Sequence, residues 1–417
     1  MKLVKYIWQN KILLVLFLLA IWLVPITIGV PEQSRTDSIV TAVGVDKTES
    51  GEYEVSLQYI IPHSSTSNES LKMSSQKGRS VEDAINRLNA HLGKLSGFAH
   101  CRVIVFNDKA CEDNFTQILD SFVRQKTNAN NIVLINTKNS AKDLLNISNN
   151  LDGNLYSYLN NSAFSYELKD YEDLKSIGDY YRSYFGISKS LMVNVIDIEE
   201  DKKPTKNSSS EGSPEEGATE TSSSESSSSG GGNSEKKLVN DGKTIILKDE
   251  KKLLDLDKTQ SNNLKWFNKN IKQHNFEILN YSDDNLKNAD LIFSVYDKDV
   301  KNKIYFKNGV PCFDIHLKIF IRTSEVVAKN LSQKDYEIQQ QIFTETLYNA
   351  IKEKVKTDMA SAEKHFKENN YDVIDCEELF RKFKNKEYTN FVSSLPEGEN
   401  FINKVVFSYS VDVAKGS

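Results

Sequence analysis

The sequence predicts a mixed α/β (α+β) fold in which an N-terminal membrane anchor precedes an ectodomain of several domains. One long apolar stretch occurs, at residues 12–30, close to the start of the chain. Strand-like and helix-like segments alternate along the remainder, and 417 residues exceed what one hydrophobic core normally supports. We therefore expect mixed sheets with packed helices in two or three domains.

The apolar stretch at residues 12–30 is long enough to cross a membrane as one helix. At 1.5 Å per residue its roughly nineteen residues span the ~30 Å hydrocarbon core. Residues 1–11 hold three lysines and no acid, so we expect this basic tail in the cytosol and the body outside the membrane. A cleaved signal peptide is the alternative, although the stretch is longer than a usual signal-peptide core and has no A-x-A site.

The exported body is mildly acidic. The chain has a formal net charge of −5, and residues 1–11 contribute +3 while residues 12–30 contribute nothing, so residues 31–417 carry −8. A dedicated nucleic-acid binder usually presents a basic face, and we expect no nucleic-acid partner.

Residues 36–188 are predicted to form an N-terminal α/β domain. Two alternating runs, at residues 38–46 and 53–62, flank a Glu-Ser-Gly turn and predict a hairpin. The segments that follow predict a helix capped by Ser80, a buried strand at residues 101–106, a helix at about 112–125, a strand at 131–136 and a helix near 140–147. This order is typical of helices packed on a mixed sheet.

Residues 189–275 are predicted to form a middle domain that carries a disordered Ser-rich insertion at residues 201–237. Between residues 207 and 234, twelve of the 28 positions are Ser and no large apolar residue occurs. Such a composition cannot bury enough surface to offset the entropy lost on ordering. Strand-like runs at residues 191–198 and 243–248 flank the insertion and are expected to pair across it.

Residues 276–417 are predicted to form a C-terminal α/β domain. The expected elements are strands near residues 289–296, 303–306 and 312–321, a long helix at 333–365, a short strand at 373–374, a helix at 376–384 and a last strand at 404–413. The long helix has an apolar stripe made of Ile338, Ile342, Leu347, Ile351 and Val355.

Motifs that would indicate an enzyme are absent from the sequence. It contains no Gly-rich phosphate loop, no H-E-x-x-H, no C-x-x-C and no G-x-S-x-G. His91, His100, Cys101 and Cys111 are metal-ligand types, but their spacing matches no zinc pattern. We expect no catalysis, no cofactor and no metal, and a disulfide between Cys312 and Cys376 remains open.

Acidic residues near position 376 admit two interpretations. Asp372, Asp375, Glu377 and Glu378 could supply the paired carboxylates of a hydrolase. Acids before and inside the first turn of a helix also stabilise its dipole, and we expect this capping role.

A possible ligand or partner surface consists of two groups of residues. Tyr180, Tyr181 and Tyr184 lie at helical spacing, which favours ordinary packing and leaves a binding pocket as the alternative. Arg381 and Lys382 begin a basic run at a helix C-terminus, a position that favours positive charge and could also meet an anionic partner.

Several short motifs resemble those of the Ger(x)C family, the C subunits of spore germinant receptors. They are residues 44–47 (GVDK) with 51–55 (GEYEV), 78–81 (GRSV), 97–105 (GFAHCRVIV), 246–253 (ILKDEKKL) and 263–267 (NLKWF). The order of the closing elements also resembles the family, so the resemblance covers residues 36–417.

The resemblance implies a three-domain α/β ectodomain on the outer face of the spore inner membrane. It also implies assembly with a permease-like subunit and a second membrane subunit to sense nutrients and trigger germination, without catalytic residues. The chain departs from the family at residues 29–32 (GVPE), where members usually carry an acylated Cys. A single span at residues 12–30 would then replace the lipid anchor. An extracytoplasmic solute-binding module and a carboxylate-dependent hydrolase are the alternatives.

Overall fold

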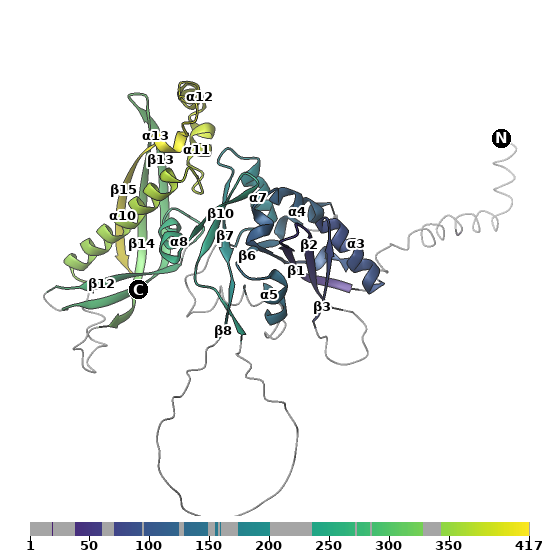
Figure 1. Ribbon diagram of the computed structural model, residues 1–417. Helices are drawn as coiled ribbons and strands as arrows, with labels where there is room; N and C mark the ends of the chain where they lie inside the picture. Colours follow the sequence, from purple (N-terminus) through teal and green to yellow (C-terminus); the bar gives the residue numbers. More distant parts are fainter. Residues whose placement is uncertain are drawn as a thin grey trace, which may run out of the picture.

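The computed structural model describes residues 38–60, 71–93, 96–124, 129–148, 174–200, 236–271, 273–283, 286–327 and 343–416, with Leu19, Leu155, Tyr156 and Leu159. Two sheets, each with its own helices, lie side by side, the N-terminal one at the right of Figure 1 and the C-terminal one at the left. The predicted mixed α/β class is therefore confirmed. Apart from Leu19, the predicted anchor lies outside the described residues, and so does the insertion up to residue 235. Within the described ranges no helix is both long and apolar enough to cross a membrane.

The first sheet has nine strands in the order β11-β10-β7-β6-β5-β1-β2-β3, with β4 paired to β1. Its strands are β1 (Ser38–Lys47), β2 (Tyr53–Ile60), β3 (Lys72–Gly78), β4 (Ser96–Gly97), β5 (Val103–Asn107), β6 (Val133–Thr137), β7 (Ser190–Val195), β10 (Thr244–Lys248) and β11 (Lys251–Leu256). The central strands β1, β5, β6 and β7 are parallel, and antiparallel strands extend the sheet on both sides. The predicted hairpin at the start of the body is β1 with β2.

Helices cover both faces of the first sheet (Figure 1). One face packs against α3 (Val81–Leu92), α4 (Phe115–Val123) and α7 (Ile177–Tyr184), and the other against α5 (Ala141–Ser148). Short 3-10 helices η2 (Phe98–His100), η3 (Asp108–Cys111) and η4 (Ala129–Asn131) connect these elements. In β5, Ile104 and Phe106 enter the first core while Val103 and Val105 enter the second. A strand buried on both faces explains the uninterrupted apolar run in the sequence.

The strands that flank the insertion pair with each other, as predicted. β7 pairs antiparallel with β10, and the short strands β8 (Asp197–Glu200) and β9 (Lys236–Val239) form a ribbon beyond them. Glu200 and Lys236 are direct partners in this ribbon, so the two ends of the insertion meet.

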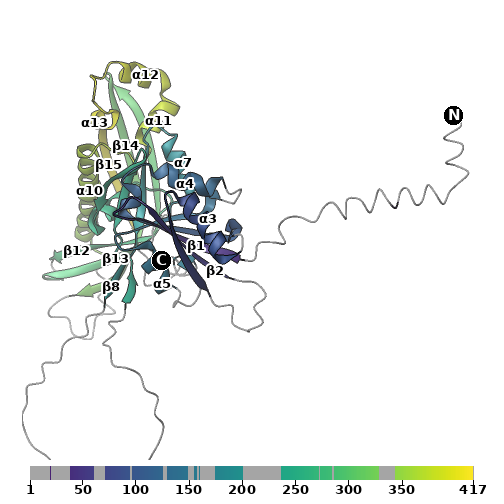
Figure 2. The same ribbon diagram turned by 45° about the vertical axis from the view of Figure 1, so that its right-hand side comes forward.

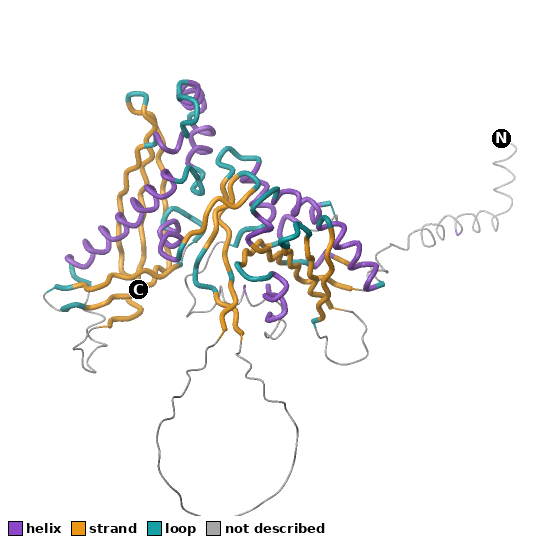
Figure 3. Tube along the Cα trace, viewed as in Figure 1, coloured by secondary structure: helices purple, strands orange, loops and turns teal. Residues whose placement is uncertain are grey.

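The second sheet has the order β12-β13-β14-β15. Its elements are β12 (His274–Tyr281), β13 (Ala289–Lys307), β14 (Val310–Val327) and β15 (Val406–Lys415), with helices α8 (Lys258–Lys265), α10 (Glu345–Glu368), α11 (Cys376–Phe383), α12 (Asn385–Ser393) and α13 (Phe401–Lys404). Figure 3 shows α10 running along these strands. Leu347, Ile351 and Val355 are fully buried, which confirms that part of the apolar stripe; Ile338 and Ile342 lie outside the described residues.

Three sequence predictions fail at least in part in the second half. The long helix predicted at residues 333–365 begins at Glu345, with Thr344 as its N-cap, so the described residues 343 and 344 lie outside it. The strands predicted at residues 289–296 and 303–306 are one continuous strand, β13, which pairs with β14 along nearly its whole length; Asp297, Asp299 and Lys301 between them are exposed, whereas Lys298 is buried. The strand predicted at residues 373–374 is a bend, in which the Ile374 amide donates to the Asp372 side chain and not to a neighbouring strand.

The two halves lie next to each other (Figure 2), and buried residues of both belong to one core. Ile246 of β10 and Leu256 of β11 belong to the same buried cluster as Leu317 of β14. The Lys248 ammonium also donates to the Asn370 carbonyl across the junction. Strands β7, β10 and β11 belong to the middle domain predicted from the sequence, and in the structure they extend the first sheet. The division into domains at residues 36–188, 189–275 and 276–417 stays a prediction.

Candidate functional site

A cleft of about 410 Å³ lies at the junction of the two halves. One wall is formed by α7 and the segment after it, residues 186–192. The opposite wall is formed by the end of α8 and by residues 373–379, where α11 begins. Clefts between domains are common places for ligands, so this is the candidate functional site.

Local hydrogen bonding fixes the charges on the α7 wall. Ser176 and Asp179 form a capping box, in which the Asp179 amide donates to Ser176 Oγ at 3.2 Å and the Ser176 amide donates to Asp179 Oδ2 at 3.0 Å. Arg182 then donates to Asp179 Oδ1 at 2.7 Å. Burial alone would raise the pKa of Asp179, but the hydrogen bonds from Ser176 and the positive charges of Lys175 and Arg182 together outweigh it and lower that pKa.

Asp372 caps α11 from the opposite wall. Its Oδ1 accepts from the amides of Ile374 and Cys376, both at 3.1 Å, and its Oδ2 accepts from the amide of Glu377 at 2.9 Å. This geometry confirms the capping role expected from the sequence. The residue is 4% exposed, and burial raises the pKa of its carboxyl to about 6 in spite of these bonds. Backbone amides bind both Asp372 oxygens, and the negative charge of Asp375 adds to the rise in the Asp372 pKa.

Asp375 lines the cleft, and although the residue as a whole is exposed, its carboxyl is partly enclosed by the cleft walls. Its backbone is left-handed, with φ 55°, a conformation that Asp and Asn tolerate better than most residues. Burial by the walls raises the pKa of Asp375, while the positive charges of Lys175, Arg182 and Lys269 partly offset that rise. Among the described contacts, the Asp375 carboxylate has no hydrogen bond and no ion pair.

The predicted tyrosines lie on α7 but face away from the cleft. Tyr180 is 2% exposed, belongs to the first core and shares a 2.6 Å hydrogen bond with Thr116. Its ring stacks on Tyr184 with centroids 6.0 Å apart, and Tyr184 donates to Glu250 at 2.7 Å. Tyr181 is half-buried beside them. Ordinary packing therefore accounts for Tyr180, whereas Tyr184 also lines a separate hollow of about 380 Å³, and a binding role for these tyrosines stays a prediction.

The predicted basic residues lie at the far end of α11. Arg381 binds the Glu378 carboxylate through two nitrogens, at 3.0 and 2.6 Å, and Glu378 itself lines the cleft. The Lys382 ammonium lies over the ring of Phe383, which is 62% exposed. Lys175 and Arg182, before and within α7, and Lys269, after α8, also line the cleft and were not predicted from the sequence, because the two segments share no local pattern.

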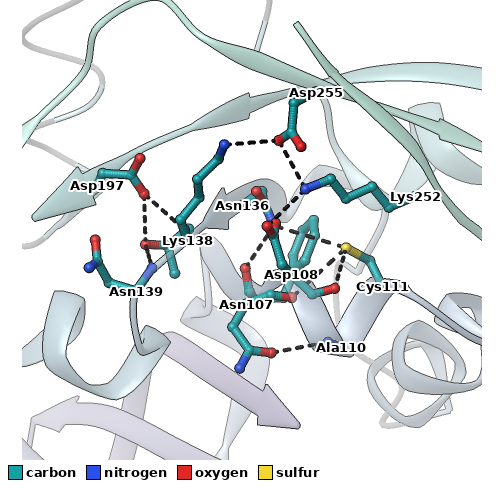
Figure 4. Close-up of polar contacts among 12 residues, drawn as sticks. Asn107, Asp108, Ala110, Cys111, Asn136, Lys138, Asn139, Asp197, Lys252 and Asp255 are labelled. Atoms are coloured by element: carbon teal, nitrogen blue, oxygen red, sulfur yellow. Dashed lines mark hydrogen bonds and ion pairs between the residues drawn. The ribbon is translucent and has the colours of Figure 1, made fainter.

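A polar network joins β11 to the carboxyl ends of the parallel strands (Figure 4). The Lys252 ammonium lies 2.8 Å from Asp108, after β5, and 2.9 Å from Asp255 of β11. Lys138, after β6, reaches Asp255 at 3.4 Å, and its amide donates to Asp197 at 2.8 Å. Burial would lower the pKa of Lys252, but its two carboxylate partners raise it. The network thus holds together β11 and the base of the insertion.

The motif residues at 44–47 and 78–81 have structural roles. Asp46 accepts from the amides of Ala141 and Lys142, at 2.7 and 3.0 Å, and so caps α5. A Cβ at Gly44 would press on Ala141, and one at Gly78 would collide with the backbone at the start of α3. These residues bring helices close to the first sheet.

The cysteines and acidic residues offer no metal or disulfide site in the described part of the chain. All four cysteines are free and buried, so Cys312 and Cys376 are not paired. Burial raises the pKa of Cys101 and of Cys111 to about 12. No group of three or more His, Cys, Asp or Glu among the described residues could hold a metal ion.

Comparison with known proteins places the chain in a family. Residues 35–198 match the family described as spore germination protein N-terminal domain, and residues 241–414 match spore germination B3/GerAC like, C-terminal. The structure is similar to the crystal structure of the GerBC protein, with a TM-score of 0.51 and 15% identity over 89% of this chain and 96% of that one. No curated protein matches the chain by sequence. The two matched domains and the shared fold show that the chain belongs to the Ger(x)C family of spore germination proteins.

Proposed function

We propose that this chain is the non-catalytic C subunit of a nutrient germinant receptor. It assembles with a permease-like subunit and a second membrane subunit, and the assembly senses nutrients and triggers germination. The single observation that carries the proposal is the presence of both family domains in one chain, at residues 35–198 and 241–414.

The architecture supports a role in assembly. The matched domains share a buried core, because Ile245 and Leu247 of the second domain pack with Val193 of the first, so the two domains can act as one body. The residues that carry the family motifs, such as Gly44, Asp46 and Gly78, are used to build the fold. Recognition of partner subunits then depends on residues at the surface of the chain, as is usual for a non-catalytic subunit.

The N-terminal segment supports a place at the spore inner membrane. Residues 12–30 hold no charge and follow a tail with three lysines, which favours one span with the body on the outer face of that membrane. One span also anchors a protein more firmly than one acyl chain, and residues 29–32 hold no Cys to acylate.

Affinity purification tests the assembly. The full chain, tagged at its C-terminus, is isolated from detergent-solubilised spore membranes, and co-purifying proteins are identified by mass spectrometry. We expect a permease-like subunit and a second membrane subunit in stoichiometric amounts. A tagged chain without residues 1–30 serves as the comparison and should fractionate away from membranes. Recovery of the full chain alone, under conditions that preserve other membrane complexes, would contradict the proposal.

The cleft favours a second candidate, a solute-binding module. It lies between two parts of the chain and contains both charged and apolar side chains, as ligand sites do. The two roles are compatible, since a receptor subunit can also bind a solute. The hydrolase alternative receives no such support, because the Asp372 oxygens are occupied by backbone amides.

A further inference from the structure

We propose that the cleft between the two halves binds a small zwitterionic solute, one that carries an ammonium group, a carboxylate group and an apolar side chain. The inference concerns a ligand of this chain itself and goes beyond its role as a subunit. The volume of about 410 Å³ lies within the range of ~300–1,000 Å³ found for small-ligand sites.

The first argument is the distribution of charge in the cleft. Arg182 pairs with Asp179 at 2.7 Å, and Glu378 is held by Arg381, so these charges already have partners. Asp375 and Lys269 also line the cleft, and neither makes a hydrogen bond or ion pair with another side chain in the described part of the structure. The opposite charges of Asp375 and Lys269 attract each other, but the two side chains are not in contact. We call these two residues the open pair.

A zwitterion satisfies both members of this open pair. Its ammonium group can donate to Asp375, and its carboxylate can accept from Lys269, with Lys175 also facing this region. Hydrogen bonds between charged partners are stronger than neutral ones. The cleft is lined by three cations and three carboxylates, so a solute without net charge preserves the balance.

The second argument is the apolar surface beside these charges. Leu264 and Phe267 on one wall and Leu191 on the other line the cleft, and each is less than a tenth exposed. They offer a place for an aliphatic or aromatic side chain of the solute. Apolar walls with a few convergent polar groups are typical of small-molecule sites.

The third argument is that the site includes both halves of the molecule. Leu191 belongs to β7 of the first sheet, whereas Lys269 follows α8 and Asp375 precedes α11 in the second half. A solute bound to both walls would stabilise their arrangement. We therefore expect binding to raise the melting temperature of the chain.

Calorimetric titration of the purified full chain in detergent tests the proposal. The probes are L-leucine, L-methionine and L-phenylalanine, together with two leucine analogues that each lack one charge, 3-methylbutylamine and 4-methylpentanoate. We expect saturable binding of at least one amino acid. If L-leucine binds, both analogues should bind at least about tenfold more weakly, because each leaves one member of the open pair without a partner.

Single substitutions test whether Asp375 and Lys269 contribute to binding. Asp375→Asn and Lys269→Gln should each weaken amino-acid binding at least about tenfold. Asn tolerates the left-handed backbone at position 375, so the fold is retained, which circular dichroism can verify. Lys258→Gln, at the exposed start of α8 and outside the cleft, is the matched control and should bind as the unsubstituted chain does.

Three results would overturn the inference: no saturable binding of any of the three amino acids, equal affinity for leucine and its singly charged analogues, or unchanged affinity in both cleft variants. The titration uses the isolated chain, so its outcome is independent of whether the chain assembles with membrane subunits.

Discussion

Replacing Asp372 by Asn should change how stability depends on pH. The carboxyl is 4% exposed and lies where α11 begins, at the junction of the two halves. Burial raises its pKa from the usual 3.8 to about 6 in the folded chain. A folded pKa above the unfolded one means that the contribution of this group to stability is complete below about pH 3.8 and is lost as pH rises through about 6.

The size of the effect follows from the shift in pKa. A difference of about two pKa units corresponds to ~3 kcal/mol in the free energy of unfolding over the whole titration. Between pH 4 and pH 7, about 2 kcal/mol of this is lost. The Asp372→Asn variant cannot titrate at this position. It also loses the acceptor for the Glu377 amide, at a cost of about 1–2 kcal/mol.

Urea unfolding of both proteins, followed by circular dichroism at pH 4, 5, 6 and 7, measures the difference. The unsubstituted chain should be the more stable at pH 4, and its advantage should shrink by roughly 2 kcal/mol by pH 7. Asp143→Asn, which removes an exposed acid from the first turn of α5, is the control for the loss of one charge. An advantage that stays constant within about 0.5 kcal/mol would refute the inferred desolvation of Asp372.

Three further predictions concern other parts of the fold. Gly78→Ala should destabilise the chain by at least about 2 kcal/mol in urea unfolding, because the new Cβ collides with the backbone of Ala84. Replacing residues 201–235 by a four-residue turn should leave the melting temperature unchanged or higher, because Glu200 and Lys236 are already partners and a shorter loop costs less entropy to close. Burial keeps the pKa of His274 well below 6.5, so only the unfolded chain gains this proton as pH falls below about 6.5. The unsubstituted chain should therefore lose up to about 1.4 kcal/mol of unfolding free energy per pH unit as the pH falls, and His274→Leu should abolish this loss. The measurement is the unfolding free energy of both proteins from pH 7 to pH 5.

Periodicity predicted the elements whose side chains alternate between core and solvent or lie on one helix face. The hairpin of β1 and β2, the buried strand β5 and the pairing of β7 with β10 follow from local patterns. Strand β3, with the sequence KMSSQKG, was not predicted, because it lies at a sheet edge and buries little apolar surface. Whether such a segment forms a strand depends on its position in the tertiary structure, which the local sequence pattern does not contain.

The cleft could not be predicted because its walls come from distant segments. The aromatic content of the Tyr180 cluster is compatible with a binding pocket, yet a large buried ring such as that of Tyr180 is also what an ordinary core contains. Asp375 was noted as an acid near a helix start, and only the fold brings it to the same cleft as Lys269. Asp372 was expected to cap α11, because capping depends on positions close in sequence.

We propose above that this chain is a required subunit of a nutrient germinant receptor. The most direct test uses spores in which every other receptor of this kind has been deleted, and compares nutrient-triggered germination with and without this chain. We predict that deletion abolishes the response to every nutrient that the parent spores detect, that complementation restores it, and that germination by a route bypassing the receptors is unaffected. Normal nutrient germination of the deletion spores would contradict the account.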